Sequence, residues 1–189
     1  MTLVICPGVH EPELTDSFLW ALGGAANYEQ HLIFPAHVYP AFSSLHILQF
    51  LQQWLHTHRN QHQCTANALT FLSFSAGVVG AMGAAWAWQQ WGGTVRAVIA
   101  LDGWGVPLVG RFPIHRISHD QFTHWSSALL GGSQDSFYAD PPVAHLDLWR
   151  SPQLAMGWWM QSTNQGEEVR SPTTAAAFLK VLLDRYETA

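Results

Sequence analysis

Residues 68–77 read Ala68-Leu69-Thr70-Phe71-Leu72-Ser73-Phe74-Ser75-Ala76-Gly77, and this stretch decides the fold. Up to Phe74 the residues are mostly apolar and typical of a buried β-strand, and small residues follow. From Ala76 to Trp91 the chain carries no charge, and its glycines at positions 77, 80 and 83 suit a helix packed closely on a sheet. We therefore expect a strand, a sharp turn at Ser75 and a closely packed helix.

On both sides of this stretch, short apolar runs alternate with helical patterns, which is typical of βαβ units and a parallel sheet covered on both faces. The sequence therefore predicts an α/β fold, a three-layer αβα sandwich with a mostly parallel central sheet, formed by residues 1–189 as a single domain. The expected strands are 3–6, 31–34, 69–74, 95–101 and 114–118; the expected helices start at Thr15 or Asp16, at Ser43 or Ser44, at Ala76 and at Ser171-Pro172. Residues 121–170 show a loose pattern and are expected to be loop-rich, as a candidate lid or substrate-facing segment.

Composition narrows the classes of partner. The 189 residues are 48% hydrophobic and 11% charged, with a formal net charge of −5 and eight Lys and Arg. Such a chain cannot supply a cationic track for nucleic acid. The N-terminus lacks the features of a signal peptide, because Pro7 and Gly8 interrupt the apolar run 3–6. We expect a cytoplasmic protein in which Cys6 and Cys64 are reduced thiols.

One apolar stretch raises the alternative of a membrane helix. Residues 60–95 contain no Asp, Glu, Lys or Arg, and residues 68–88 are long enough to span a bilayer. The first half of that stretch has the composition of a strand, however, and the glycines favour packing on a sheet. We therefore expect no stable membrane span.

The turn at Ser75 is a candidate nucleophile elbow. In such a turn a serine lies between a strand and a helix in a strained backbone conformation, and the residues two before and two after it must be small. Here these residues are Ser73 and Gly77, so the pattern is S-x-S-x-G where G-x-S-x-G is usual. The alternative interpretation of Ser75 is a buried serine or a helix N-cap.

With this turn, the chain resembles the α/β-hydrolase superfamily, particularly its small lipase-like and esterase-like members, over residues 2–186. The resemblance implies a catalytic triad in the chain order nucleophile, acid, histidine. It places the nucleophile at Ser75, the acid at Asp120 after the strand 114–118, and the base at His145 in Pro142-Val143-Ala144-His145-Leu146.

Several residues compete for these roles. Asp102, at the end of the strand 95–101, is the alternative acid, since some members of the family place the acid there, and Asp147 is a second rival. His119 and His124 are the competing bases. The resemblance also implies backbone N–H donors for an oxyanion, from Ala76 and from Val9 or His10.

Two other kinds of site remain open as alternatives. His115, His119, Asp120 and His124 include residue types that bind zinc, although a strand would keep His115 and His119 apart. The spacing of Gly77, Gly80 and Gly83 resembles a dinucleotide-binding loop without its G-x-G start. We expect neither, and so no cofactor and no metal.

These observations predict a serine hydrolase that cleaves a carboxylic ester or thioester of a small or apolar acyl compound through an acyl-enzyme. Trp104 and Trp125 are candidate pocket residues, because they follow strand ends. The alternative is a non-catalytic α/β-hydrolase-like protein that binds a ligand or partner. The sequence does not predict an oligomeric state.

Overall fold

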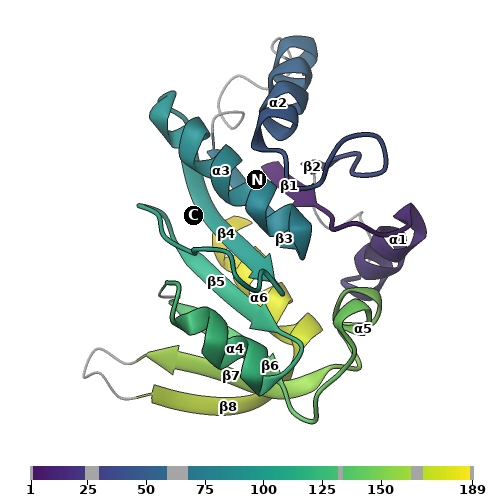
Figure 1. The fold of residues 1–189 in the computed structure, drawn as a ribbon, viewed down its shortest axis with the longest axis vertical. Coiled ribbons are helices and arrows are strands. Elements are labelled where there is room, and N and C mark those ends of the chain that lie inside the picture. Colours follow the sequence, from purple (N-terminus) through teal and green to yellow (C-terminus); the bar gives the residue numbers. More distant parts are fainter. Residues whose placement is uncertain (1, 24–29, 59–67, 132–133, 163–167, 188–189) are drawn as a thin grey trace.

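The structure is a computed structural model, and it describes residues 2–23, 30–58, 68–131, 134–162 and 168–187. Strands and helices alternate along most of the chain (Figure 1). In chain order they are β1 Thr2–Cys6, α1 Pro12–Ala21, β2 Gln30–Ile33, α2 Ser44–His58, β3 Ala68–Phe74, α3 Ala76–Gln90, β4 Thr94–Leu101, β5 Ile114–Ser118, α4 Gln121–Ala128, β6 Asp135–Ala139, α5 His145–Arg150, β7 Met156–Ser162, β8 Glu168–Thr174 and α6 Ala175–Glu187.

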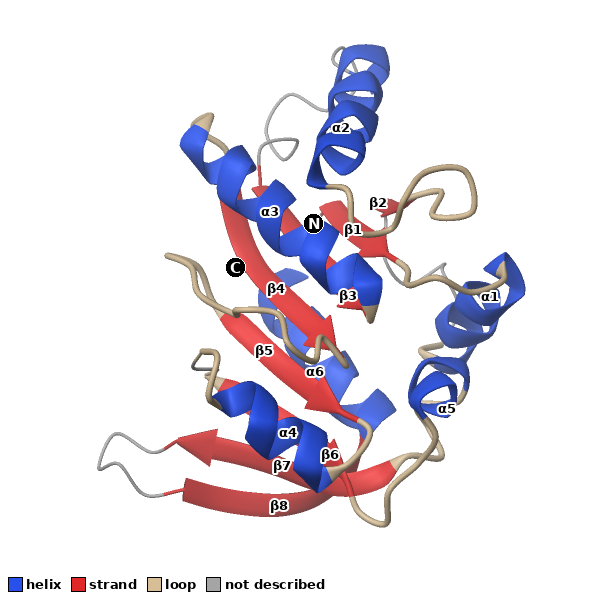
Figure 2. Cartoon of the chain, in the orientation of Figure 1, coloured by secondary structure: helices blue, strands red, loops and turns tan. Residues whose placement is uncertain are grey.

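One sheet runs through the described residues in the strand order β2-β1-β3-β4-β5-β6-β7-β8. The pairs from β2 to β6 are parallel, and β7 and β8 are added as an antiparallel extension. Helices cover both faces: α3 and α4 lie in front of the sheet in Figure 2, and α6 lies behind it. This arrangement confirms the predicted fold class, a three-layer αβα sandwich with a mostly parallel central sheet.

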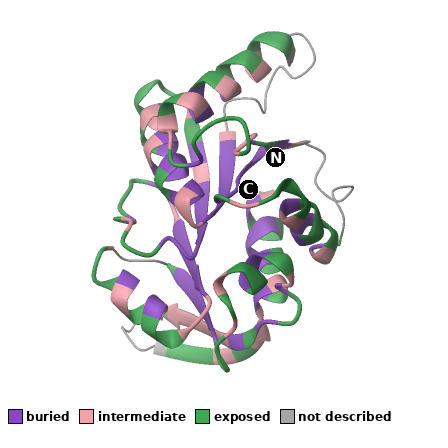
Figure 3. Cartoon of the chain, turned by 45° about the vertical axis from the view of Figure 1, so that its right-hand side comes forward, coloured by how far each residue is buried: buried purple, intermediate pink, exposed green. Residues whose placement is uncertain are grey.

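The central strands are buried because each of their faces packs against helices (Figure 3). Alternate residues of β3 divide between the two cores: Leu72 and Phe74 face the layer of α1, α5 and α6, and Leu69 and Phe71 face the layer of α2 and α3. This period of two follows from the strand pleat. Burial of both faces of β3 also explains why its sequence is mostly apolar and does not alternate between apolar and polar residues.

The glycines of α3 allow the helix to approach its neighbours closely. A Cβ on Gly77 would lie 2.2 Å from the backbone oxygen of Cys6, and one on Gly80 would lie 2.4 Å from that of Ala41. The third, Gly83, faces the side chain of Ser44 at the start of α2. Close packing is therefore the role of this glycine spacing in the structure, and the dinucleotide interpretation gains no support from it.

The C-terminal third differs most from the sequence expectation. Residues 121–170, expected to be loop-rich, contain α4, α5 and the sheet strands β6 and β7. The expected helix start at Ser171-Pro172 is wrong, because both residues lie in β8 and α6 begins at Ala175. Pro172 is compatible with β8 because this strand is the last in the sheet order and has one free edge. The start of α1 is also earlier than expected, at Pro12.

Two further expectations concern the thiols and the membrane. Cys6 is a buried free cysteine, whereas Cys64 lies outside the described residues. Burial raises the pKa of the Cys6 thiol far above its usual range. None of the helices among the described residues is both long and apolar enough to cross a membrane.

Candidate active site

Ser75 lies at the carboxyl end of β3, at the sharp turn that the sequence predicts. Its backbone has φ 53° and ψ −125°, a conformation that few non-glycine residues adopt. Two hydrogen bonds hold the turn, from Ser75 N–H to Leu101 O at 2.9 Å and from Val78 N–H to Ser75 O at 3.0 Å. Ser75 is the N-cap residue of α3, but its side chain makes no capping hydrogen bond. Its hydroxyl is therefore available to another partner.

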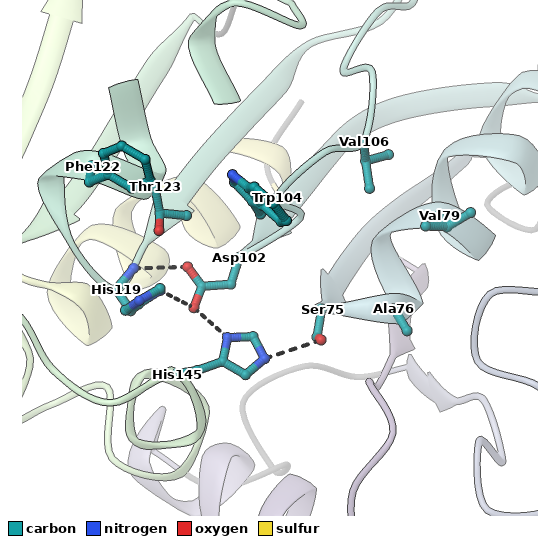
Figure 4. A pocket seen from close by; sticks show the side chains of 10 residues that line it. All are labelled: Ser75, Ala76, Val79, Asp102, Trp104, Val106, His119, Phe122, Thr123 and His145. Atoms are coloured by element: carbon teal, nitrogen blue, oxygen red, sulfur yellow. Dashed lines mark hydrogen bonds and ion pairs between the residues drawn. The ribbon is translucent and has the colours of Figure 1, made fainter. Parts of the chain in front are cut away.

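That partner is His145, the first residue of α5. The Ser75 Oγ lies 3.1 Å from His145 Nε2, and His145 Nδ1 lies 2.8 Å from Asp102 Oδ2 (Figure 4). Because an ionised carboxylate only accepts hydrogen bonds, the proton of the neutral imidazole sits on Nδ1. Nε2 then accepts from the serine hydroxyl. This is the chain of hydrogen bonds that allows an imidazole to take a proton from a serine.

The carboxylate that contacts His145 is that of Asp102. The sequence predicts Asp120 in this place, but Asp120 has a different partner. Asp120 is the N-cap of α4, where its Oδ1 accepts the Thr123 N–H at 2.6 Å. This local bond fixes the Asp120 side chain at the helix start. Asp102 follows β4, has a positive φ of 51° and points its side chain toward His145.

The other rival residues have partners elsewhere. Asp147 pairs with Arg150 at 3.0 Å on the exposed side of α5. His124 Nε2 lies 2.9 Å from Ser136 Oγ, between α4 and β6. The remaining rival base, His119, is part of the site, but it contacts Asp102 and makes no contact with Ser75 that we find among the described residues.

His119 reaches Asp102 through two hydrogen bonds. Its backbone N–H donates to Asp102 Oδ1 at 2.8 Å, and its Nδ1 lies 2.8 Å from Asp102 Oδ2. His145 and His119 thus share one carboxylate oxygen, and their rings stand nearly perpendicular with centroids 5.9 Å apart. The sequence indicates His119 only as a rival base or metal ligand, and it does not predict this shared carboxylate.

The electrostatics of the site favour an ionised Asp102. Burial alone would raise the pKa of this carboxyl, since the side chain is 1% exposed. The hydrogen bonds from His119 and His145 overcome the desolvation, and the pKa of Asp102 lies below its usual value. The pKa of His119 is raised, chiefly by its hydrogen bond to Asp102 and against the effect of partial burial.

A cavity of about 410 Å³ opens beside the Ser75 hydroxyl. It is lined by the three residues of the hydrogen-bond chain together with Ala76, Val79, Trp104, Val106, His119, Phe122 and Thr123 (Figure 4). Trp104 and Phe122 are largely exposed, so the cavity has an apolar rim. Of the two predicted pocket residues, Trp104 lines this cavity. Trp125, on α4, is not among the residues that line it, and its side chain is largely exposed.

The predicted oxyanion donors occupy two segments that meet at Ser75. Ala76 is the first residue of α3 and lines the cavity, and a first-turn N–H has no acceptor within its own helix. A Cβ on Gly8 would lie 2.9 Å from Ser75 Cβ, so the loop that carries Val9 and His10 starts directly against the nucleophile. The His10 ring lies beside Phe74 and is not among the residues that line the cavity.

A metal site is a second chemical possibility for these residues. The four residues of the zinc interpretation do not converge: His115, for example, is fully buried and lies 2.7 Å from Tyr186 Oη. Among the described residues, the group that could hold an ion is Asp102, His119 and His145, with ligand atoms within 4.8 Å of one another. All three atoms are already joined by hydrogen bonds, which leaves no unsatisfied ligand that points to a metal.

Comparisons with known proteins add little to this geometry. No family model and no curated protein matches the sequence. A solved structure that matches is a Trichoderma reesei cutinase in complex with a C11Y4 phosphonate inhibitor, with 18% sequence identity and a TM-score of 0.38. The match covers 68% of this chain and 70% of the cutinase chain. At this level the likeness carries no argument about function, which depends on the site itself.

Proposed function

We propose that the protein is a serine hydrolase of the α/β-hydrolase superfamily that cleaves a carboxylic ester or thioester through an acyl-enzyme. One observation carries this proposal: Ser75 Oγ, His145 and Asp102 are joined by hydrogen bonds of 3.1 Å and 2.8 Å at the mouth of a cavity. The three side chains come from the ends of β3 and β4 and from α5, which are far apart in the sequence. Such convergence is the geometric criterion for a nucleophile with its base and orienting acid.

In the proposed reaction, Ser75 Oγ attacks the acyl carbon while its proton passes to Nε2 of His145. The bond from that carbon to the leaving oxygen or sulfur then breaks, and the leaving group takes the same proton. Water attacks the acyl-enzyme by the reverse route, with His145 again accepting a proton, and the acid product and free Ser75 result. Asp102 holds the Nδ1–H tautomer and stabilises the imidazolium formed in each step.

The negative charge that develops on the acyl oxygen needs donors that are already in place. The backbone N–H of Ala76 is proposed as one donor, since it stands at the N-terminus of α3, where the helix dipole also favours negative charge. The second is proposed to be the N–H of Val9 or His10, because their loop contacts Ser75 through Gly8. Gly8 leaves the space that this approach requires.

The cavity supports an apolar acyl group as the substrate class. Val79, Trp104, Val106 and Phe122 supply carbon surface on the walls and rim. Each methylene that enters such a site from water gains roughly 0.8 kcal/mol. A longer acyl chain would therefore bind better than an acetyl group until the cavity is filled.

The deciding experiment is covalent labelling of the purified protein with a fluorophosphonate, measured by intact-protein and peptide mass spectrometry. Wild type should gain one adduct, located on Ser75, and Ser75→Ala should gain none. His145→Ala should label at least about a hundredfold more slowly, because the general base is lost. Ser17→Ala is the matched control, since this serine lies on α1 and donates to Glu13 O.

Two outcomes would contradict the proposal. Labelling of Ser75→Ala at the wild-type rate would show that another nucleophile reacts. A folded wild-type protein that takes no label would favour the alternative, a non-catalytic protein that uses the same cavity to bind a ligand or partner.

A further inference from the structure

We propose that His119 is a positioning residue for Asp102 and that its protonation switches the site off as the pH falls. This inference rests on the proposed function, because it concerns how the hydrogen-bond chain of Ser75, His145 and Asp102 is held and regulated. His119 lies beside that chain and does not touch the nucleophile. Its effect would pass through the carboxylate that it shares with His145.

The positioning role follows from the number of donors on one buried carboxylate. Asp102 Oδ1 accepts the His119 N–H, and Oδ2 accepts both the His119 and the His145 Nδ1–H groups, each at 2.8 Å. The two bonds from His119 fix both carboxylate oxygens, so the Asp102 side chain cannot rotate without breaking one of them. Oδ2 is thereby held where His145 needs it to orient its ring toward Ser75.

The switching role follows from what surrounds His119. The acidic groups that face it are Asp102 at the end of β4 and Asp120 at the start of α4, whose Oδ2 lies 3.5 Å from His119 Nε2. Between them, these two carboxylates favour a cationic His119, which is 24% exposed and open to protons from the cavity. The next neighbour is His145, on α5.

No other charge of these elements that the structure describes is directed at His119. On α5, Asp147 and Arg150 pair with each other. On β5, Arg116 donates to the backbone oxygens of His124 and Gly131. The charge state of His119 is therefore set by Asp102 and Asp120 and opposed by any positive charge on His145.

A cationic His119 conflicts with the reaction because His145 must also become a cation. The two rings are 5.9 Å apart and would compete for the single negative charge of Asp102. Repulsion between two unit charges at that separation, at an effective dielectric constant of about 20, slows formation of the second cation by roughly a hundredfold. Serine activation would thus require both imidazoles to be neutral, whereas most sites of this type require one.

The test is the pH dependence of the fluorophosphonate labelling rate in wild type and in two variants. In His119→Asn the amide nitrogen stands near the place of Nδ1, so a donor to Asp102 remains but the titrating group is gone. In His119→Ala the side-chain donor is lost as well. His56→Asn, an exposed histidine on α2, is the matched control.

We expect the logarithm of the wild-type rate to fall with a slope that approaches two on the acidic side and to follow a slope of one in both His119 variants. At pH 8 His119→Asn should react faster than His119→Ala, because it keeps a donor to Asp102, and His119→Ala should react about tenfold more slowly than wild type, the effect of losing one hydrogen bond to a charged group. Should His119→Ala fail to fold, His119→Asn alone carries the test. His56→Asn should reproduce the wild-type profile.

Equal slopes in wild type and His119→Asn would overturn the switch, and an undiminished rate in folded His119→Ala would overturn the positioning role. A merely structural His119 would lower stability without changing the slope. These failures are distinct from failure of the proposed function, in which folded wild type takes no label at any pH and the inference about His119 falls with it.

Discussion

Asp102 and Asp120 follow neighbouring strands of the same sheet and have opposite fates. Asp102 follows β4 and lies buried, with both carboxylate oxygens accepting hydrogen bonds from histidines. Asp120 follows β5, is partly exposed and caps α4 through the Thr123 N–H. Parallel strands bring both acids to the same edge of the sheet. The edge alone therefore does not select the functional acid.

The difference between them lies in the local backbone. Asp102 precedes Gly103 in a turn at positive φ, which directs its side chain along the sheet edge toward His145. Asp120 has extended backbone and is followed directly by a helix. Its side chain accepts a capping hydrogen bond from an N–H group in the first turn of that helix. A carboxylate next to a helix start has a local partner, and one in a bare turn remains available to residues distant in the sequence.

The largest expected effect comes from replacing each acid by its amide. Asp102→Asn should slow labelling of Ser75 by about a thousandfold or more, because an amide cannot hold the Nδ1–H tautomer of His145. Asp120→Asn should stay within about fivefold of wild type at pH 8, since a partly exposed ion pair is worth less than about 1 kcal/mol. Both labelling rates are measured by quenching the reaction at set times and quantifying the adduct by mass spectrometry.

The opposite result would reverse the comparison. If Asp120→Asn lost activity and Asp102→Asn kept it, Asp120 would be the acid and the arrangement at His145 would not be the reactive one. Circular dichroism of both variants would show whether a loss reflects unfolding.

His115, at the other end of β5 from Asp120, is a buried titratable group, and it extends the comparison of buried and partly exposed groups. Burial lowers the pKa of His115 from 6.5 to about 4, an effect that exceeds the opposing attraction of Asp135. The unfolded chain therefore binds a proton that the folded protein resists. Stability from this group is complete above pH 6.5 and is lost toward pH 4, by up to about 1.4 kcal/mol per pH unit.

The measurement is urea denaturation at several pH values in wild type and His115→Gln, which keeps an amide near Tyr186 Oη. The variant should depend less steeply on pH between 6.5 and 4. Two other histidines also have shifted pKa values. The pKa of His124 is lowered by burial, and the pKa of His119 is raised, chiefly by its hydrogen bond to Asp102, so that His119 shifts stability in the opposite direction. Both residues are present in wild type and in the variant. Their effects cancel in the difference, and parallel curves would show that His115 is not the group responsible.

The smallest effect isolates the local role of Asp120. Asp120→Ala should lower the free energy of unfolding by about 1 kcal/mol, because α4 loses its N-cap. Asp120→Asn should retain most of that stability, since asparagine caps nearly as well. Chemical denaturation of the two variants at neutral pH distinguishes capping from charge, and equal losses in both would assign the effect to the carboxylate charge.

The parts of this molecule that are specified locally were predictable from the sequence. β3, its turn and α3 depend on composition within a few residues, and Ser75 lies where the pattern indicates. The N-cap role of Asp120 also had a local signal, because Asp120-Gln121-Phe122-Thr123 precedes a helix. Because an N-cap residue already has a local partner, this signal favours Asp102 over Asp120 as the acid.

Interactions between distant segments could not be predicted. His119 meets Asp102 because β4 and β5 pair in register, and that register is not visible in either strand alone. The last three strands of the sheet, β6, β7 and β8, could not be predicted for a related reason. Their residues mix polar, aromatic and glycine positions, and β8 contains Pro172, so only pairing across the sheet identifies them as strands.

The close contacts around Ser75 have a consequence for how this turn is recognised in other chains. The position that is usually glycine is Ser73 here, and its hydroxyl is satisfied by Ile99 O at 3.2 Å inside the sheet. The places that admit no side chain are Gly77, within α3, and Gly8, in a loop 67 residues before Ser75. A search profile that spans residues 73–77 alone would score this chain poorly, whereas one that also requires a glycine just after the first strand would retain it.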